Sequence, residues 1–327
     1  MGSGKWDTTR YHSDRATRVS TGTADFAYTA TAVKTHKIHD DLDPLRINHK
    51  PFGKLESRDS VEHPNSNAVF VAFDVTGSNY ERAVDAQKKL PNLMDLLGKY
   101  LTDPQLLVAA NDDYTVVGRN AIQISDYESD NRIDEHIRNI WLVRNGGGND
   151  GESYDLLLYA AARKTVTDCF EKRGKKGYYF MYADEPIFEK VTPSHVSDVF
   201  GESLQESIPI AEIIEEVQRQ YHTFVIWPER GYEHARAQYV KLFGEESVLT
   251  LQHPNLICEM IGSVIGLNEG RVSSDGIVRD LIEVGSTKSE ASSVSQALAR
   301  MAKLGDLARG TGSLPDIGEK AKGASRL

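Results

Sequence analysis

Short apolar runs alternate with helix-like segments along the middle of this chain, between residues 68 and 268. The apolar runs lack the in–out alternation of half-exposed strands, as expected when helices cover both faces of a parallel sheet. The pattern therefore predicts an α/β fold with a doubly wound, mostly parallel sheet. The predicted strands are residues 68–73, 106–110, 121–125, 177–183, 223–227 and 248–251. The predicted helices are residues 83–97, split at Pro91, and residues 130–143, 152–170, 208–221, 232–243 and 254–267.

Two flanking segments lack this alternation. Residues 1–65 are polar and show no sustained periodicity, so we predict an extended N-terminal arm that lies across the folded body. Residues 271–327 carry a weak helical stripe and end in a stretch rich in Gly, Ser and Lys. This composition predicts a C-terminal tail that is partly helical and partly flexible. The expected organisation is an arm over 1–65, an α/β domain over 66–270 and a tail over 271–327.

Composition narrows the classes of partner. The formal net charge is −10 at pH 7, which disfavours nucleic-acid binding over a basic face. No apolar run approaches the roughly 18 residues of a membrane span, and the first residues lack the apolar block of a signal peptide. The two cysteines, Cys169 and Cys258, lie in apolar segments and are interpreted as reduced, buried thiols. We therefore expect a cytoplasmic protein with neither nucleic-acid nor membrane partners.

Oxygen-bearing side chains alternate directly after the first predicted strand, at Asp74, Thr76 and Ser78. A hard divalent cation such as Mg²⁺ requires oxygen ligands in near-octahedral geometry and usually retains several waters. In open α/β sheets, ligands bind outside the carboxyl ends of the strands. Asp112 and Asp184 also follow predicted strands. These positions together predict a divalent-cation site at one edge of the sheet, with Asp112 either orienting waters there or lying in a solvated turn.

The sequence Asp74-x-Thr76-x-Ser78 after a buried strand resembles the metal-ion-dependent adhesion site (MIDAS) of von Willebrand factor A (vWA) domains, of the bacterial or phage intracellular type. Two further loops match that family in the same order. One is the glycine-rich turn at residues 146–151 before a predicted helix, and the other is Asp184 after a core strand. The resemblance implies a six-stranded, Rossmann-like domain over residues 68–268, with the arm and tail outside it.

The resemblance also implies roles for individual residues. Thr76 and Ser78 would contact the metal directly, whereas Asp74 and Asp184 would act mainly through coordinated waters. Asn149 would fill the second-loop position, where the family usually has Thr or an acid; Asp150 is a competing candidate, and Glu152 matches a later glutamate of bacterial variants. The implied ligand set for Mg²⁺, with Mn²⁺ or Ca²⁺ as alternatives, is Asp74, Thr76, Ser78, Asn149 and Asp184.

The function implied by the resemblance is metal-dependent protein–protein interaction. An open coordination position would accept a carboxylate from a partner protein, which for some bacterial members is an ATPase of the AAA+ class. The alternative is a structural subunit of a larger assembly, in which arm and tail make intersubunit contacts. RNA binding occurs in one branch of the family but is disfavoured by the acidic charge.

An enzyme is the weaker interpretation, and no catalytic residue is assigned. A phosphatase of the haloacid dehalogenase type would need a second Asp where Thr76 stands. Neither a phosphate-binding glycine motif after the first strand nor a nucleophile elbow is present in the sequence.

Overall fold

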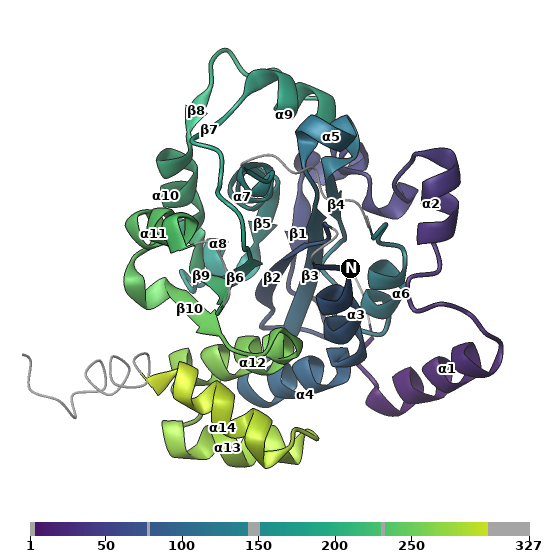
Figure 1. The fold of residues 1–327 in the computed structure, drawn as a ribbon, viewed down its shortest axis with the longest axis vertical. Helices are drawn as coiled ribbons and strands as arrows, with labels where there is room; N and C mark the ends of the chain where they lie inside the picture. Colours follow the sequence, from purple (N-terminus) through teal and green to yellow (C-terminus); the bar gives the residue numbers. More distant parts are fainter. Residues whose placement is uncertain (1–3, 77–78, 143–150, 230–232, 300–327) are drawn as a thin grey trace, which may run out of the picture.

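A six-stranded sheet forms the centre of the computed structural model, which describes residues 4–76, 79–142, 151–229 and 233–299 (Figure 1). The strand order is β10-β9-β6-β2-β3-β4, and all neighbours are parallel except the pair β3 and β4. The strands are β2 (Asn67–Asp74), β3 (Pro104–Asn111), β4 (Ile122–Ile124), β6 (Gly177–Tyr182), β9 (Tyr221–Pro228) and β10 (Val248–Leu251). The prediction of a mostly parallel six-stranded α/β sheet is confirmed.

Helices cover both faces of this sheet, and each face has its own hydrophobic cluster. Along β2, Val69 and Val71 belong to one cluster and Phe70 and Ala72 to the other, because successive strand residues point to opposite faces. The helices of the first face are α3 (Tyr80–Lys88), α4 (Leu90–Tyr100), α6 (Arg132–Arg138) and α12 (Ile257–Asn268). Those of the second face are α7 (Tyr154–Arg163), α10 (Ile210–Gln220) and α11 (Glu233–Phe243).

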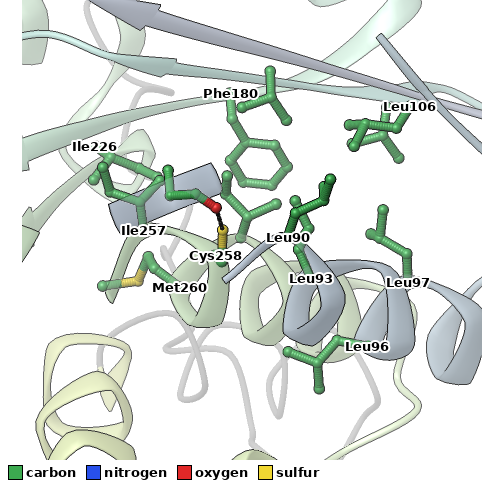
Figure 2. Close-up of a cluster of buried hydrophobic side chains, with 14 of the residues drawn as sticks. Leu90, Leu93, Leu96, Leu97, Leu106, Phe180, Ile226, Ile257, Cys258 and Met260 are labelled. Carbon is green, nitrogen blue, oxygen red and sulfur yellow. Dashed lines mark hydrogen bonds between the residues drawn. The ribbon is translucent and has the colours of Figure 1, made fainter. Parts of the chain in front are cut away.

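The first cluster contains many branched aliphatic side chains. Figure 2 shows Leu90, Leu93 and Leu97 of α4 beneath Phe180 of β6 and Leu106 of β3. Cys258 of α12 is buried in the same cluster, and its Sγ donates to the carbonyl oxygen of Ala86 at 3.4 Å. Both cysteines are free and buried, as predicted.

The N-terminal arm is more structured than the sequence predicted. Residues 8–20 and 29–35 form helices α1 (Thr8–Ser20) and α2 (Thr29–Thr35) rather than extended chain, and β1 (Leu55–Ser57) pairs with β5 (Thr165–Thr167). Tyr11 and Arg18 are the buried side chains of α1. Because only one of the two is apolar, α1 shows little of the hydrophobic periodicity from which helices are predicted. The arm is therefore packed onto the domain by isolated anchors.

The tail residues described here form a pair of helices, α13 (Ser274–Glu283) and α14 (Lys288–Ala297). They pack on α12, on the side away from the sheet (Figure 1). Ile277, Leu281 and Val294 are buried and extend the first hydrophobic cluster. Residues 300–327, for which we predict flexibility, lie outside the described residues.

Two predicted helices are shorter in the structure. The segment 152–170 divides into α7, strand β5 and the short helix α8 (Asp168–Glu171), because the β-branched run Thr165–Thr167 pairs with β1. Within residues 130–142, which the structure describes, only α6 is an α-helix. Helices α5 (Tyr114–Val117) and α9 (Pro193–Phe200) were not predicted. The antiparallel pair of β7 (Lys190–Val191) and β8 (Ile208–Pro209), which flank α9 in sequence, was not predicted either. Among the described helices, none combines the length and the apolar character needed to cross a membrane.

Candidate functional site

The sheet has its topological switch point between β2 and β6. From β2 the chain continues outward to β3 and β4, whereas from β6 it continues in the other direction to β9 and β10. Asp74 is the last residue of β2, and Asp184 lies two positions beyond the end of β6. Ligands of open α/β sheets bind at such a point, outside the carboxyl ends of the strands. The predicted site residues Asp74 and Asp184 are therefore in the expected place.

Asp74 is held by hydrogen bonds to both of its oxygens. Its Oδ1 accepts from the backbone nitrogen of Thr76 at 2.8 Å and from Thr76 Oγ1 at 2.6 Å. Its Oδ2 accepts from Tyr154 Oη at 2.6 Å. The same Tyr154 oxygen accepts from the backbone nitrogen of Asp184 at 3.4 Å. Tyr154, the first residue of α7, thus joins the ends of β2 and β6.

Two further loops converge on these strand ends. Glu152 donates its backbone N–H to the carbonyl oxygen of Pro186 at 3.2 Å, so the segment before α7 lies against the loop after β6. Ser153 Oγ accepts from the backbone nitrogen of Tyr114 at 2.9 Å, which brings the loop after β3 to the same edge. Glu152, at the end of the glycine-rich second loop, therefore lies against the third predicted loop, which follows β6. Ser78, Asn149 and Asp150 lie outside the described residues, and their assignment as ligands stays a prediction.

Four acidic side chains at this edge are close enough to repel one another. Burial, followed by the charge of Asp184, raises the pKa of Asp74 to about 6. Burial raises the pKa of Asp112 to about 7, with a contribution from Asp74. The pKa of Glu152 rises to about 10 through burial and the charges of Asp74, Asp112 and others. A divalent cation would relieve this repulsion and favour the ionised forms.

Several buried polar atoms at this edge lack a hydrogen-bond partner among the described residues. They are Asn111 Oδ1 and Nδ2, Asp112 Oδ2 and Glu152 Oε2. A buried polar atom left unpaired costs roughly 1–3 kcal/mol, so such groups normally mark a position for an ion or ordered water. The carboxylate, hydroxyl and amide oxygens gathered here are the donors that Mg²⁺ prefers. The chain's own residues therefore fit the cation that the sequence implies.

The described residues do not by themselves form a complete metal centre. Within them, no group of three or more His, Cys, Asp or Glu side chains is arranged to hold a metal ion. The predicted ligand set has only two carboxylates, and two of its five members, Ser78 and Asn149, are not among the described residues. Of the described members, Asp74 and Thr76 are buried and in contact, and Asp184 lies beside them.

Sequence reasoning missed Tyr154, Asn79 and Arg82. Asn79 Nδ2 donates to Asp184 Oδ1 at 3.3 Å, and Arg82 Nη1 donates to Asp184 Oδ2 at 2.9 Å. These contacts join residues more than 100 positions apart, so no local spacing predicts them. For Tyr154, the one available signal is its position as the first helical residue after a glycine-rich loop.

The chain resembles known proteins in structure but not in sequence. Neither a protein-family model nor a curated protein sequence matches the chain. Many solved structures are similar at low identity, among them the following three. Proximal thread matrix protein 1 from the mussel byssus has 14% identity and a TM-score of 0.43, over 63% of this chain and 46% of its own. The pilus adhesin SpaC from Lactobacillus rhamnosus GG has 9% identity and a TM-score of 0.43, over 66% of this chain and 31% of its own. A von Willebrand factor type A structure from Catenulispora acidiphila has 17% identity and a TM-score of 0.39, over 63% of this chain and 43% of its own.

This chain thus spans less than half the length of each of these three structures. At such identities and TM-scores the likeness carries no argument about function.

The acid cluster leads to a prediction about stability and pH. In the folded chain the pKa of Asp112 is about 7, far above its ordinary value of 3.8. The folded state therefore holds this proton more tightly, and the stability that it contributes is lost as pH rises from about 4 through about 7. In EDTA, we expect Asp112→Asn to be more stable than the wild type by roughly 2 kcal/mol near neutral pH, with little difference near pH 4.

Urea denaturation across this pH range measures the effect. Saturating Mg²⁺ should reduce the difference between the two proteins, because the cation compensates the ionised carboxylates of the wild type. A difference that is the same at all pH values would contradict the raised pKa.

Proposed function

We propose that this chain is a metal-dependent protein–protein interaction module, which binds a carboxylate of a partner protein through Mg²⁺ at the switch point of the sheet. Mn²⁺ and Ca²⁺ are alternative ions. The observation that carries the proposal is the Asp74–Thr76 pair at the end of β2, surrounded by buried acids with raised pKa values. In this proposal Asp74, Thr76 and Asp184 act together with Ser78 and Asn149.

The arrangement of Asp74 favours binding over nucleophilic chemistry. Thr76 occupies its Oδ1 with two hydrogen bonds, and Tyr154 occupies its Oδ2 with one. A carboxylate nucleophile, as in the phosphatase alternative, needs an oxygen that can attack the substrate. A fixed Asp74 that orients hydroxyls and waters around a cation is better suited to hold a metal than to react. The proposed partner is another protein, for which an AAA+ ATPase stays the expectation from the resemblance.

The buried side chains of the arm and of the described tail do not support the assembly alternative. Tyr11 and Phe26 of the arm, and Ile277 and Leu281 of the tail, are buried in the chain's own first hydrophobic cluster. Side chains used within one chain are not available for intersubunit contacts. The proposal of a docking module is therefore preferred over that of a structural subunit.

Thr76→Val tests the proposed function with a near-isosteric change. It removes the hydroxyl that bonds Asp74 Oδ1 and that would contact the metal, while side-chain volume is almost unchanged. With the immobilised full chain, we expect partner capture in Mg²⁺, no capture in EDTA, and at least a tenfold loss of capture with the variant. Equal capture in Mg²⁺ and EDTA would refute metal dependence. Matching thermal unfolding curves in EDTA would show that the variant keeps its fold.

A further inference from the structure

The acid at the end of β6 already has a cationic partner in this chain. Arg82, on α3, donates through Nη1 to Asp184 Oδ2 at 2.9 Å. Asn79 donates to the other oxygen, Asp184 Oδ1, at 3.3 Å and also hydrogen-bonds Arg82 through its own side-chain oxygen. Both oxygens of Asp184 are therefore engaged by side chains from the start of α3.

The guanidinium of Arg82 is held in place from a second side. Its Cζ lies 5.3 Å from the ring centroid of Tyr182, the last residue of β6. A cation over an aromatic face adds a modest attraction to that of the ion pair. The contacts to Asp184, Asn79 and Tyr182 together orient Arg82 toward the switch point. Figure 1 shows where α3 and β6 lie in the fold.

Another cation could nevertheless replace Arg82 as the partner of Asp184. The side chains of Arg82 and Asp184 retain 24% and 12% of their exposure, whereas the whole of Asp74 retains 2%. Because Asp184 is largely buried, its charge needs a cationic partner, and water reaches the pair only from the Arg82 side. A metal ion that supplies that positive charge can therefore take over from the guanidinium. A divalent cation that takes Asp184 as an acceptor for its coordinated waters competes with the guanidinium for the charge of that carboxylate.

We propose that Arg82 is an internal counter-cation that competes with the divalent metal for Asp184 and thereby sets the metal affinity of the site. This inference rests on the proposed function, since it concerns the same site. Arg82 is a positioning residue in this scheme because it acts through Asp184 and does not itself touch the metal.

Calorimetric titration of the full chain with Mg²⁺ alone tests the competition. We expect Arg82→Met to lower the dissociation constant of Mg²⁺ about fivefold, because Asp184 no longer has to leave an ion pair. Arg82→Lys should be intermediate, because an ammonium keeps the charge but lacks the planar guanidinium fork. Lys88→Met removes an exposed charge from the far end of the same helix and should leave the constant unchanged.

A double-mutant cycle separates competition for Asp184 from a general effect of charge. In an Asp184→Asn background, Arg82→Met should have no effect on the Mg²⁺ dissociation constant, since the amide offers no carboxylate to compete for. An equal gain in both backgrounds would overturn the inference.

If the wild type and Arg82→Met bind Mg²⁺ equally well, the inference fails while the proposed function stands. If neither protein binds Mg²⁺ at millimolar concentration, the metal site itself is refuted and both proposals fail. Circular dichroism of each variant in EDTA confirms that the compared proteins are folded.

Discussion

Asp74→Ala is expected to weaken Mg²⁺ binding by about 100-fold or more. Asp74 lies at the switch point and fixes the hydroxyls of Thr76 and Tyr154, at 2.6 Å each. Its removal takes away one of the two predicted carboxylates and also the acceptor that orients both hydroxyls. Calorimetric titration of the wild type and the variant with Mg²⁺ measures the loss directly.

The same substitution should not unfold the metal-free protein. Burial raises the pKa of Asp74 to about 6, so ionising this carboxyl costs more in the folded than in the unfolded chain. Removing the carboxyl relieves that penalty, although Tyr154 loses an acceptor. We therefore expect the variant to remain folded in EDTA and to lack the Mg²⁺-dependent rise in melting temperature that we expect for the wild type.

Asp85→Ala provides a matched control. Asp85 belongs to α3, is 41% exposed and pairs only with Lys88 among the ion pairs seen here, so its loss should leave Mg²⁺ affinity unchanged. Unaltered Mg²⁺ binding by Asp74→Ala would refute the assignment of Asp74 to a metal site. A loss of binding by both variants would instead indicate a nonspecific effect of acidic charge.

The sheet could be predicted because its signal is local. Strands such as β2 and β6 are buried on both faces and therefore appear as unbroken apolar runs. Asp74 and Asp184 could be placed at one edge because parallel strands end on the same side. The split between α3 and α4 was likewise predicted from Pro91. Pro91 lies in the first turn of α4, where a backbone N–H has no intrahelical acceptor and its absence costs no hydrogen bond.

The parts that could not be predicted depend on contacts between distant segments. Arg82 and Asn79 contribute to the site only because α3 begins beside the end of β6, and that proximity follows from packing of the whole domain. Lys164 and Thr165 end α7 because strand β5 pairs with β1 of the arm, a partner that periodicity did not reveal. The arm helix α1 has a single apolar anchor, Tyr11, and so lacks an amphipathic signal.

Tyr11→Ala is expected to lower the free energy of unfolding by about 3–5 kcal/mol. The Tyr11 side chain is 1% exposed, lies in the first hydrophobic cluster and donates from its Oη to the carbonyl oxygen of Gln87 at 2.9 Å. Truncation to alanine leaves a cavity under α1 and removes the hydroxyl donor from the carbonyl of Gln87 on α3. Denaturant unfolding of the full chain measures the loss.

Two milder variants separate the causes of this effect. Tyr11→Phe keeps the ring and removes only the hydroxyl, so it should cost about 1 kcal/mol. Val19→Ala lies on the same helix but is 64% exposed, and its effect should stay within about 0.5 kcal/mol. This order of effects would show that α1 is packed as part of the domain core.

The same measurement distinguishes the two proposed functions of the chain. If the arm packs on its own domain, the unfolding midpoint of the wild type should not depend on protein concentration. If the arm docked on a neighbouring copy, as the assembly alternative requires, dilution would lower that midpoint and Tyr11→Ala would dissociate the complex before unfolding it. A concentration-independent midpoint with a large Tyr11→Ala effect would leave the metal site as the main candidate for contact with a partner. The arm would then act as a support that keeps α3, and with it Arg82, in position against the end of β6.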